Sequence, residues 1–301
     1  MTLTAALLVV LSASMHAGWN LFSKKRSPTI GFFLLATLGT IVWFSPVFFT
    51  TGDLMLRMPL SLWGILAAAG FFQAIYYTGL AGAYARGALA IAYPLARSLP
   101  VVIVVMLTFV AGRGDELSAS ALFGIAAVVA GAIILPMNNF RDLRISNYLN
   151  GSCALALVAA VGTAGYSYLD DIGMNMLKLL PGDAAGWMRA LLYLVLECIF
   201  TAVWLLVFMA FSRESVRYIR AHGRTLLGPG LMTGLAIGAT YGIILLAMTH
   251  AVNVSYVVGL RQLSIPVGAL LGIMLLGEKG SVPRYVGIAV IFSGLVLVAL
   301  G

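Results

Sequence analysis

Two arginines, Arg97 and Arg261, lie inside long apolar segments of the sequence. If those segments are helices that begin near residues 88 and 254, Arg97 lies about 14 Å and Arg261 about 11 Å along them. An arginine at such a depth in a membrane costs at least about 2.5–3.5 kcal/mol, so each must face a polar interior or a partner. Because a guanidinium presents a planar fork of N–H donors, the pair predicts a buried site for a carboxylate or phosphonate.

Glu197 is expected to be the one carboxylate deep inside an apolar segment, about 15 Å from its start. As the ion-pair partner of Arg97 or Arg261 it would be a structural tie, but one carboxylate cannot neutralise two arginines. At least one cation then remains for a substrate, a cluster of carbonyls or a terminal group. Alternatively, burial disfavours the ionised form of Glu197, and the residue loads and releases a proton as water access alternates, with His16 as a second candidate.

Polar and aromatic side chains at helical spacing are predicted to surround the same central space. His16, Trp19 and Asn20 share one face of the first apolar segment, and Tyr93 lies one turn before Arg97. A structural role for His16 stays open, because a buried histidine often hydrogen-bonds a neighbouring helix. With the two arginines, the predicted binding residues are His16, Trp19, Asn20, Gln73, Tyr76, Tyr77, Tyr93, Tyr166, Ser167, Tyr241 and Tyr256.

The composition predicts the elements that position these residues. The 301 residues are 61% hydrophobic and only 9% charged, with a mean hydropathy of +1.03, whereas soluble domains carry about 25% charged residues. A membrane-spanning helix needs about 20 apolar residues. We therefore expect an all-α integral membrane protein whose ten spans cover about residues 3–22, 29–50, 59–82, 88–111, 118–137, 149–169, 187–211, 227–249, 254–276 and 283–300. The sixth span ends before Asp170 and Asp171, which are expected in water.

Basic residues in the loops between these spans predict the orientation. The odd-numbered loops hold twelve lysines and arginines, and the even-numbered loops hold four. Since short cytoplasmic loops are enriched in basic residues, the odd loops are expected in the cytoplasm and both termini outside. This distribution accounts for the net charge of +8 without a nucleic-acid partner. In the seventh loop, the spacing of Arg213, Arg217, Arg220 and Arg224 predicts a surface helix on anionic lipid.

A weak internal repeat predicts two halves, residues 1–148 and 149–301. Each half holds five spans, an odd number, so the second half must enter the membrane inverted, as in many transporters. Prolines beside both arginines predict irregular helices, which a membrane protein tolerates only against protein or a polar cavity. The matched residues are Tyr93, Arg97 and Pro100 with Tyr256, Arg261 and Pro266, and Gly124 and Gly131 with Gly287 and Gly294.

Two paired stretches, from Tyr76 to Leu135 and from Tyr241 to Leu300, share a further pattern. Each contains a helix rich in small residues, a helix with a proline, an acidic tight turn and a helix with two glycines seven residues apart. In these features the chain resembles the drug/metabolite transporter superfamily, specifically the EamA-type ten-helix exporters. The resemblance covers essentially the whole chain and implies a carrier, but it specifies no substrate. Many members of that family are described with cytoplasmic termini, opposite to the orientation that the loop charges predict.

These patterns predict a secondary active transporter, with export as the expected direction, for a small polar metabolite such as an amino acid or organic anion across the cell inner (cytoplasmic) membrane. No P-loop pattern is present, so direct use of ATP is not expected. The alternative is an intramembrane lipid-modifying enzyme, or a lipid or phosphometabolite translocator of the same superfamily. The sequence has neither H-E-x-x-H nor G-x-S-x-G, and Cys153 and Cys198 lack metal-ligand spacing, so no enzyme activity, cofactor or metal is expected. The expected partners are the small-molecule substrate and membrane lipid; a homodimer stays open.

Overall fold

The computed structural model describes residues 2–23, 29–85, 89–135, 137–142, 150–276 and 280–300. Within these ranges the chain is helical and contains no strand. Seven helical segments are long and apolar enough to cross a membrane, and three shorter apolar helices accompany them. These helices indicate a multi-pass membrane protein. Some of these segments combine two consecutive α-helices. The α-helices of the described ranges are α1 (Leu3–Ser23), α2 (Ile30–Phe44), α3 (Phe48–Leu56), α4 (Leu60–Ala85), α5 (Leu89–Val110), α6 (Ala119–Ile134), α7 (Gly151–Leu179), α8 (Gly186–Ala210), α9 (Arg213–Met248), α10 (Val254–Leu260), α11 (Ser264–Leu276) and α12 (Val282–Leu300).

Hydrogen-bonding side chains mark several of the helix starts. A helix leaves its first four N–H groups without intrahelical partners, and an unpaired N–H is costly away from water. These polar residues therefore favour particular starting points within otherwise apolar sequence. At the starts of α2, α6, α7, α9 and α10, such an N–H donates to the side-chain oxygen of the capping residue; these residues are Thr29, Ser118, Asn150, Ser212 and Asn253, respectively.

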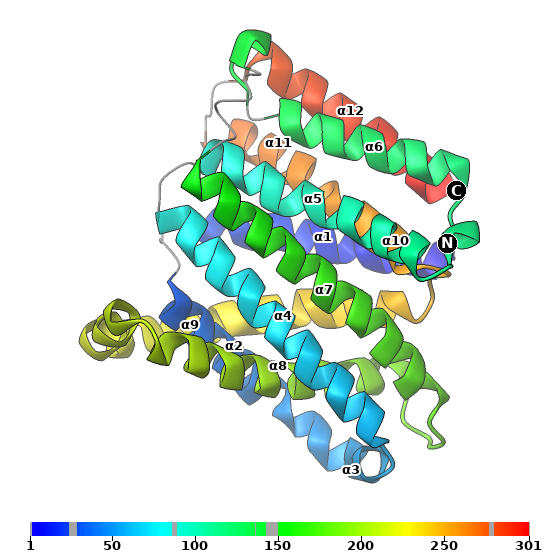
Figure 1. Cartoon of the computed structure of the whole chain (residues 1–301), viewed down its shortest axis with the longest axis vertical. Helices are drawn as coiled ribbons and strands as arrows, with labels where there is room; N and C mark the ends of the chain where they lie inside the picture. Colours follow the sequence, from blue (N-terminus) through cyan, green and yellow to red (C-terminus); the bar gives the residue numbers. More distant parts are fainter. Residues whose placement is uncertain are drawn as a thin grey trace.

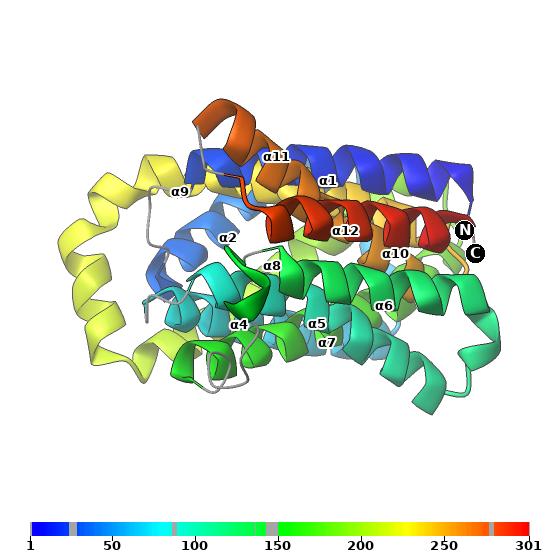
Figure 2. The same ribbon diagram turned by 90° about the horizontal axis from the view of Figure 1, so that it is seen from above.

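The helices form a bundle with α6 and α12 along one edge and α2, α3 and α8 at the opposite edge (Figure 1). Between these edges, α1, α9 and α11 lie on one side and α4, α5 and α7 on the other, as the view from above shows (Figure 2). α10 packs against both α5 and α12. The helix that carries Arg97 and the one that leads to Arg261 are therefore neighbours in the middle of the bundle.

Glycines bring α6 and α12 into close contact. A Cβ added at Gly124 would lie 2.5 Å from the Gly294 carbonyl oxygen, and one at Gly294 would lie 2.6 Å from the Gly124 carbonyl oxygen. Gly131 and Gly287 meet in the same reciprocal way, at 2.8 and 2.9 Å. A larger residue at these positions would displace backbone, and small residues are what let helices associate in lipid. The glycine pairs that the sequence singled out thus form the contact between two matching helices.

Two helices extend beyond the spans that the sequence predicts. α7 continues to Leu179, so Asp170 and Asp171 lie inside the helix and are buried; the expectation that they lie in water is wrong. α9 begins at Arg213, so the predicted basic surface helix is continuous with the apolar segment that follows. In both places charged residues end the apolar run, but a helix can continue through them where side chains find partners or remain exposed.

Both termini lie at the same end of the bundle, which we call the terminal end (Figure 1). Hydrogen bonds join the chain start with the α3–α4, α7–α8 and α9–α10 connections there. Each donor is a side chain and each acceptor a backbone carbonyl: Thr2 to His250 (2.7 Å), Arg57 to Pro181 (3.5 Å) and Lys178 to Thr249 (2.9 Å). These three connections correspond to the second, sixth and eighth loops of the predicted topology. These even-numbered loops therefore lie at one end of the molecule.

Candidate functional site

The helix that carries Arg261 is interrupted at that residue. α10 ends at Leu260, a 3₁₀ turn covers Arg261–Leu263, and α11 begins at Ser264. Pro266 explains the interruption, because proline has no N–H to donate and its ring clashes with the carbonyl four residues earlier. Within this turn the Ser264 hydroxyl donates to the Arg261 carbonyl at 3.1 Å. The irregular helix predicted for this half is confirmed.

Arg97 lies on a helix of different shape. α5 runs without interruption from Leu89 to Val110, so the break predicted from its prolines does not occur. The Arg97 side chain is 8% exposed, and its Nη2 donates to the Ser264 hydroxyl at 2.5 Å. Its buried Nε has no hydrogen-bond partner among the described residues. Because Ser264 contacts both segments, one hydroxyl links the Arg97 guanidinium to the backbone at Arg261.

Arg261 is surrounded by tyrosines. Its guanidinium carbon lies 5.1 Å from the centroid of the Tyr241 ring, and its Nη1 donates a long hydrogen bond of 3.5 Å to the Tyr166 hydroxyl. Tyr166 in turn meets Tyr241 and Tyr76 edge to face, with centroids 5.6 and 5.9 Å apart. An aromatic face stabilises a desolvated cation. The structure therefore brings the predicted residues Tyr76, Tyr166, Tyr241 and Arg261 together.

A small pocket joins the two arginines. The space inside it accommodates about one water molecule, so a metabolite would enter only after the helices move apart. Within the described part of the chain, neither guanidinium forms a salt bridge with a carboxylate. The proposed tie between an arginine and Glu197 is therefore absent. The pocket is lined by Ala96, Arg97, Thr163, Val258, Arg261 and Gln262.

Asp170 is a central carboxylate that sequence reasoning placed wrongly. It is fully buried on α7 and accepts hydrogen bonds from the hydroxyls of Tyr193, at 3.1 Å, and of Tyr241. Tyr241 is also the tyrosine beneath Arg261, so one ring joins the acid to the cation. A signal was present: Asp170 lies three residues after Ser167 and four after Tyr166, on one helical face.

Glu197 is buried on α8, and neither of its carboxyl oxygens has a hydrogen-bond partner among the described residues. Asp170 and Arg261 are its charged neighbours. Gln73 and Ser167 are also buried, and Gln73 Oε1 and Ser167 Oγ have no partner in the described ranges. An ionised carboxylate without a partner is strongly disfavoured away from water, so this environment is unfavourable for a charged Glu197.

The other predicted residues lie in several environments. Tyr77 is buried and stacks on Phe33, with ring centroids 4.6 Å apart. His16, on α1, is partly buried and lies within electrostatic reach of both arginines. Tyr256 does not reach the pocket with its hydroxyl, which donates to the Glu116 carbonyl at 3.3 Å near the terminal end. Trp19 and Asn20 on α1 and Tyr93 on α5 have side chains outside the described part of the structure.

Sequence reasoning missed three polar residues at this site: Thr163 and Gln262, which line the pocket, and Ser264, which accepts a hydrogen bond from Arg97. The stretch Thr163-Ala164-Gly165-Tyr166 resembles His16-Ala17-Gly18-Trp19 of the first apolar segment, and this likeness is the signal that could have found Thr163. Gln262 and Ser264 directly follow Arg261, but only the 3₁₀ turn brings them beside Arg97. Gln262 Nε2 donates to the Val258 carbonyl at 3.0 Å, and its buried Oε1 has no partner within the described residues.

Comparison with known proteins identifies the fold and nothing finer. No family model and no curated protein matches the chain. Among solved structures, 25 chains match. One, described only as the crystal structure of a protein, superposes with a TM-score of 0.65 over 98% of this chain and 97% of its own, at 18% sequence identity. The helical arrangement is shared. At this identity the likeness shows the fold alone.

Proposed function

We propose that the protein is a secondary active transporter that carries a small anionic or zwitterionic metabolite, such as an amino acid or organic anion, across the cytoplasmic membrane. The observation that supports this most directly is Arg97. It is buried beside Arg261, forms no salt bridge in the described ranges, and has an Nε without a partner. A buried cation with an unused donor is best satisfied by a bound anion.

The helix contacts support a carrier made of ten spans in two inverted halves, the EamA-type arrangement. In two inverted halves, each contact between helices should have a counterpart in which every helix is replaced by its equivalent in the other half. The counterpart of the contact between α4 and α7 is then the contact between α9 and α1. The counterpart of the contact between α2 and α9 is the contact between α8 and α4. All four contacts exist, as do the self-matching contacts of α6 with α12 and of α2 with α8. Inverted repeats place the substrate near the midplane, at their interface. The pocket has residues of both proposed halves, 1–148 and 149–301, in its lining.

We also propose that proton binding drives the transport. Two buried carboxylates, Asp170 and Glu197, lie next to a single arginine, Arg261. Two negative charges beside one positive charge favour an additional proton in a dry environment. As helices separate and water enters, the same carboxylate can ionise. His16 remains a second candidate because it lies near the arginines.

A binding screen followed by flux measurements tests this function. Purified protein is screened by thermal shift against carboxylates, amino acids and phosphonates, and each stabilising compound is then assayed for flux into proteoliposomes. Arg97→Lys keeps the charge but loses the fork of donors, so affinity should fall about tenfold to hundredfold, the equivalent of one hydrogen bond between charged groups.

Arg57→Lys is the matched control. This exposed arginine contacts a backbone carbonyl at the terminal end, far along the sequence from the pocket residues, and its replacement should leave affinity unchanged. Unchanged affinity in both Arg97→Lys and Arg261→Lys would contradict the anion site.

A further inference from the structure

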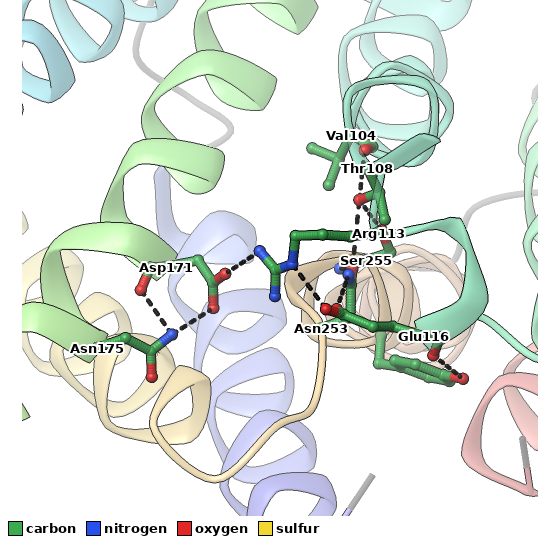
Figure 3. A network of polar contacts seen from close by, with 9 residues as sticks. Val104, Thr108, Arg113, Glu116, Asp171, Asn175, Asn253 and Ser255 are labelled. Carbon is green, nitrogen blue, oxygen red and sulfur yellow. Dashed lines mark hydrogen bonds and ion pairs between the residues drawn. The ribbon is translucent and has the colours of Figure 1, made fainter. Parts of the chain in front are cut away.

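A charged network lies at the terminal end, outside the pocket. Arg113, in the turn between α5 and α6, donates from Nε to Glu116 Oε1 at 2.8 Å and from Nη1 to Asp171 Oδ2 at 3.4 Å. Figure 3 shows its guanidinium between the two carboxylates, with Asn175 on the far side of Asp171. One arginine thus joins the α5–α6 turn of the first proposed half to α7 of the second.

The same turn is also bound to α10. Asn253, the N-cap of α10, donates from Nδ2 to Glu116 Oε2 at 2.7 Å, and the Tyr256 hydroxyl donates to the Glu116 carbonyl at 3.3 Å. The backbone N–H of Ser118 donates to that hydroxyl at 3.2 Å. Thr108 on α5 contacts Asn253 as well (Figure 3). Three elements, α5 with its turn, α7 and α10, therefore meet at a single set of polar contacts.

This network lies directly beyond the central site. Tyr256 precedes Arg261 by five residues, about 7.5 Å along a helix. Asp171 follows Asp170, the acid bound to Tyr241 beneath Arg261. The network is therefore connected to the central site through both α7 and α10.

We propose that the Arg113–Glu116–Asp171–Asn253 network is the closure that shuts the pocket from the terminal end, and that it breaks when the protein opens there. The proposal rests on the proposed transport function, because it assigns this contact to one state of an alternating cycle. Its chemistry suits a contact that must break. Arg113 and Glu116 are 31% and 29% exposed, and an ion pair with such access to water adds little stability. Asp171 is 2% exposed, so its carboxylate would gain access to water as the contact opens.

The access of a thiol reagent to the pocket tests the closure. Thr163→Cys places a nearly isosteric thiol in the pocket lining, in a background with the buried Cys153→Ala and Cys198→Ala. A membrane-impermeant maleimide is applied from the terminal end, using intact cells or inverted vesicles. Separate cysteines at positions 178 and 217, at opposite ends of the predicted topology, establish which preparation exposes that end.

We expect the rate of labelling to rise at least tenfold in Arg113→Gln and in Glu116→Gln. The second variant is isosteric with the wild type, so it tests the closure even if Arg113→Gln folds poorly. Arg57→Gln replaces an arginine at the same end whose partner among the described residues is a backbone carbonyl, and it should leave the rate unchanged. Equal labelling rates in all four proteins would overturn the closure.

This measurement is independent of any substrate. Faster labelling without flux of any solute would support the closure and contradict transport. Flux that persists while neither variant labels faster would contradict the closure and leave the transport function standing.

Discussion

Arg97 and Arg261 occupy matching places in the predicted sequence repeat, yet their surroundings differ. Arg97 lies on a continuous helix and has one hydroxyl partner, Ser264, and a buried Nε without a partner in the described residues. Arg261 begins a 3₁₀ turn, faces the Tyr241 ring and donates to Tyr166. The first guanidinium retains a donor to offer, whereas the second is enclosed by tyrosines.

This difference indicates a division of roles. A buried donor without a partner is costly, so a ligand oxygen contributes most where such a donor exists, at Arg97. Arg261 instead supplies positive charge close to the buried acids Asp170 and Glu197. We infer that Arg97 binds the substrate anion and that Arg261 stabilises the charge balance around it.

Removing each positive charge gives the largest expected contrast. Arg97→Gln should lower substrate affinity at least about hundredfold, because both the charge and the donor fork are lost. Its folded yield should be kept, since no described carboxylate pairs with Arg97. Arg261→Gln should instead lower the melting temperature by about 2–8 °C, from a cation–π contact of about 1–2 kcal/mol.

Ligand-binding titration and thermal unfolding of both variants measure this contrast. Wild-type protein and Arg57→Gln serve as controls. If the two variants lost affinity and stability to the same extent, the division of roles between the arginines would be wrong.

The Glu197→Gln variant should distinguish a role of Glu197 in proton coupling from a role as a structural counter-ion. Because no described residue pairs with the carboxylate, the substitution should change the melting temperature by less than about 2 °C, the size of effects within about 0.5 kcal/mol. Gln imitates the protonated acid, so accumulation driven by a proton gradient should be lost while exchange of substrate persists. A loss of folded yield would show that Glu197 is a structural counter-ion. Wild-type flux indifferent to a pH gradient would exclude coupling through Glu197 and His16 alike.

The sequence predicts the apolar helices and the two arginines well, because both depend on local composition and on the cost of burying charge. The sequence fails to predict the surroundings of a charged residue where these depend on contacts between distant segments. Asp170 is buried because Tyr193 and Tyr241, from two other helices, donate hydrogen bonds to it. Its spacing places it on the same face of α7 as Tyr166, but no pattern within α7 identifies these two donors. Arg113 was counted only as a loop charge for the same reason: its partner Asp171 comes from another helix.

The break in the helix at Arg261, which α5 lacks at Arg97, is expected to have a smaller effect on substrate affinity. Pro266→Ala restores an N–H to the segment after Arg261 and lets the helix continue, as α5 continues through Arg97. We expect Arg261 to leave the tyrosines, with substrate affinity lowered about threefold to tenfold, the equivalent of about 1 kcal/mol. Pro100→Ala is the matched control, because α5 is already continuous. Affinity titrations of both variants measure the effect, and equal losses would show that the break has no special role.

The smallest expected effect is the contribution of Glu116, which binds the start of α10, to thermal stability. α10 begins after Asn253, whose amide donates to Glu116, and the Arg113 hydrogen bond together with this amide lowers the pKa of Glu116 below its usual 4.5. Folding therefore favours the ionised form of Glu116. Its stabilisation is fully present above about pH 4.5 and is lost as the pH falls through the lower folded-state pKa.

Glu116→Gln removes this pH-dependent contribution. The variant should melt below the wild type by no more than about 2–4 °C at pH 7, because partly exposed ion pairs contribute at most about 1 kcal/mol. The difference should shrink as the pH falls below about 4.5, where the wild-type carboxylate also becomes neutral. Asp53→Asn, an exposed acid on α3, is the control. Thermal unfolding from pH 7 to pH 3.5 measures both variants. A difference for Glu116→Gln that stays constant with pH would mean that the anchor of α10 does not depend on this charge.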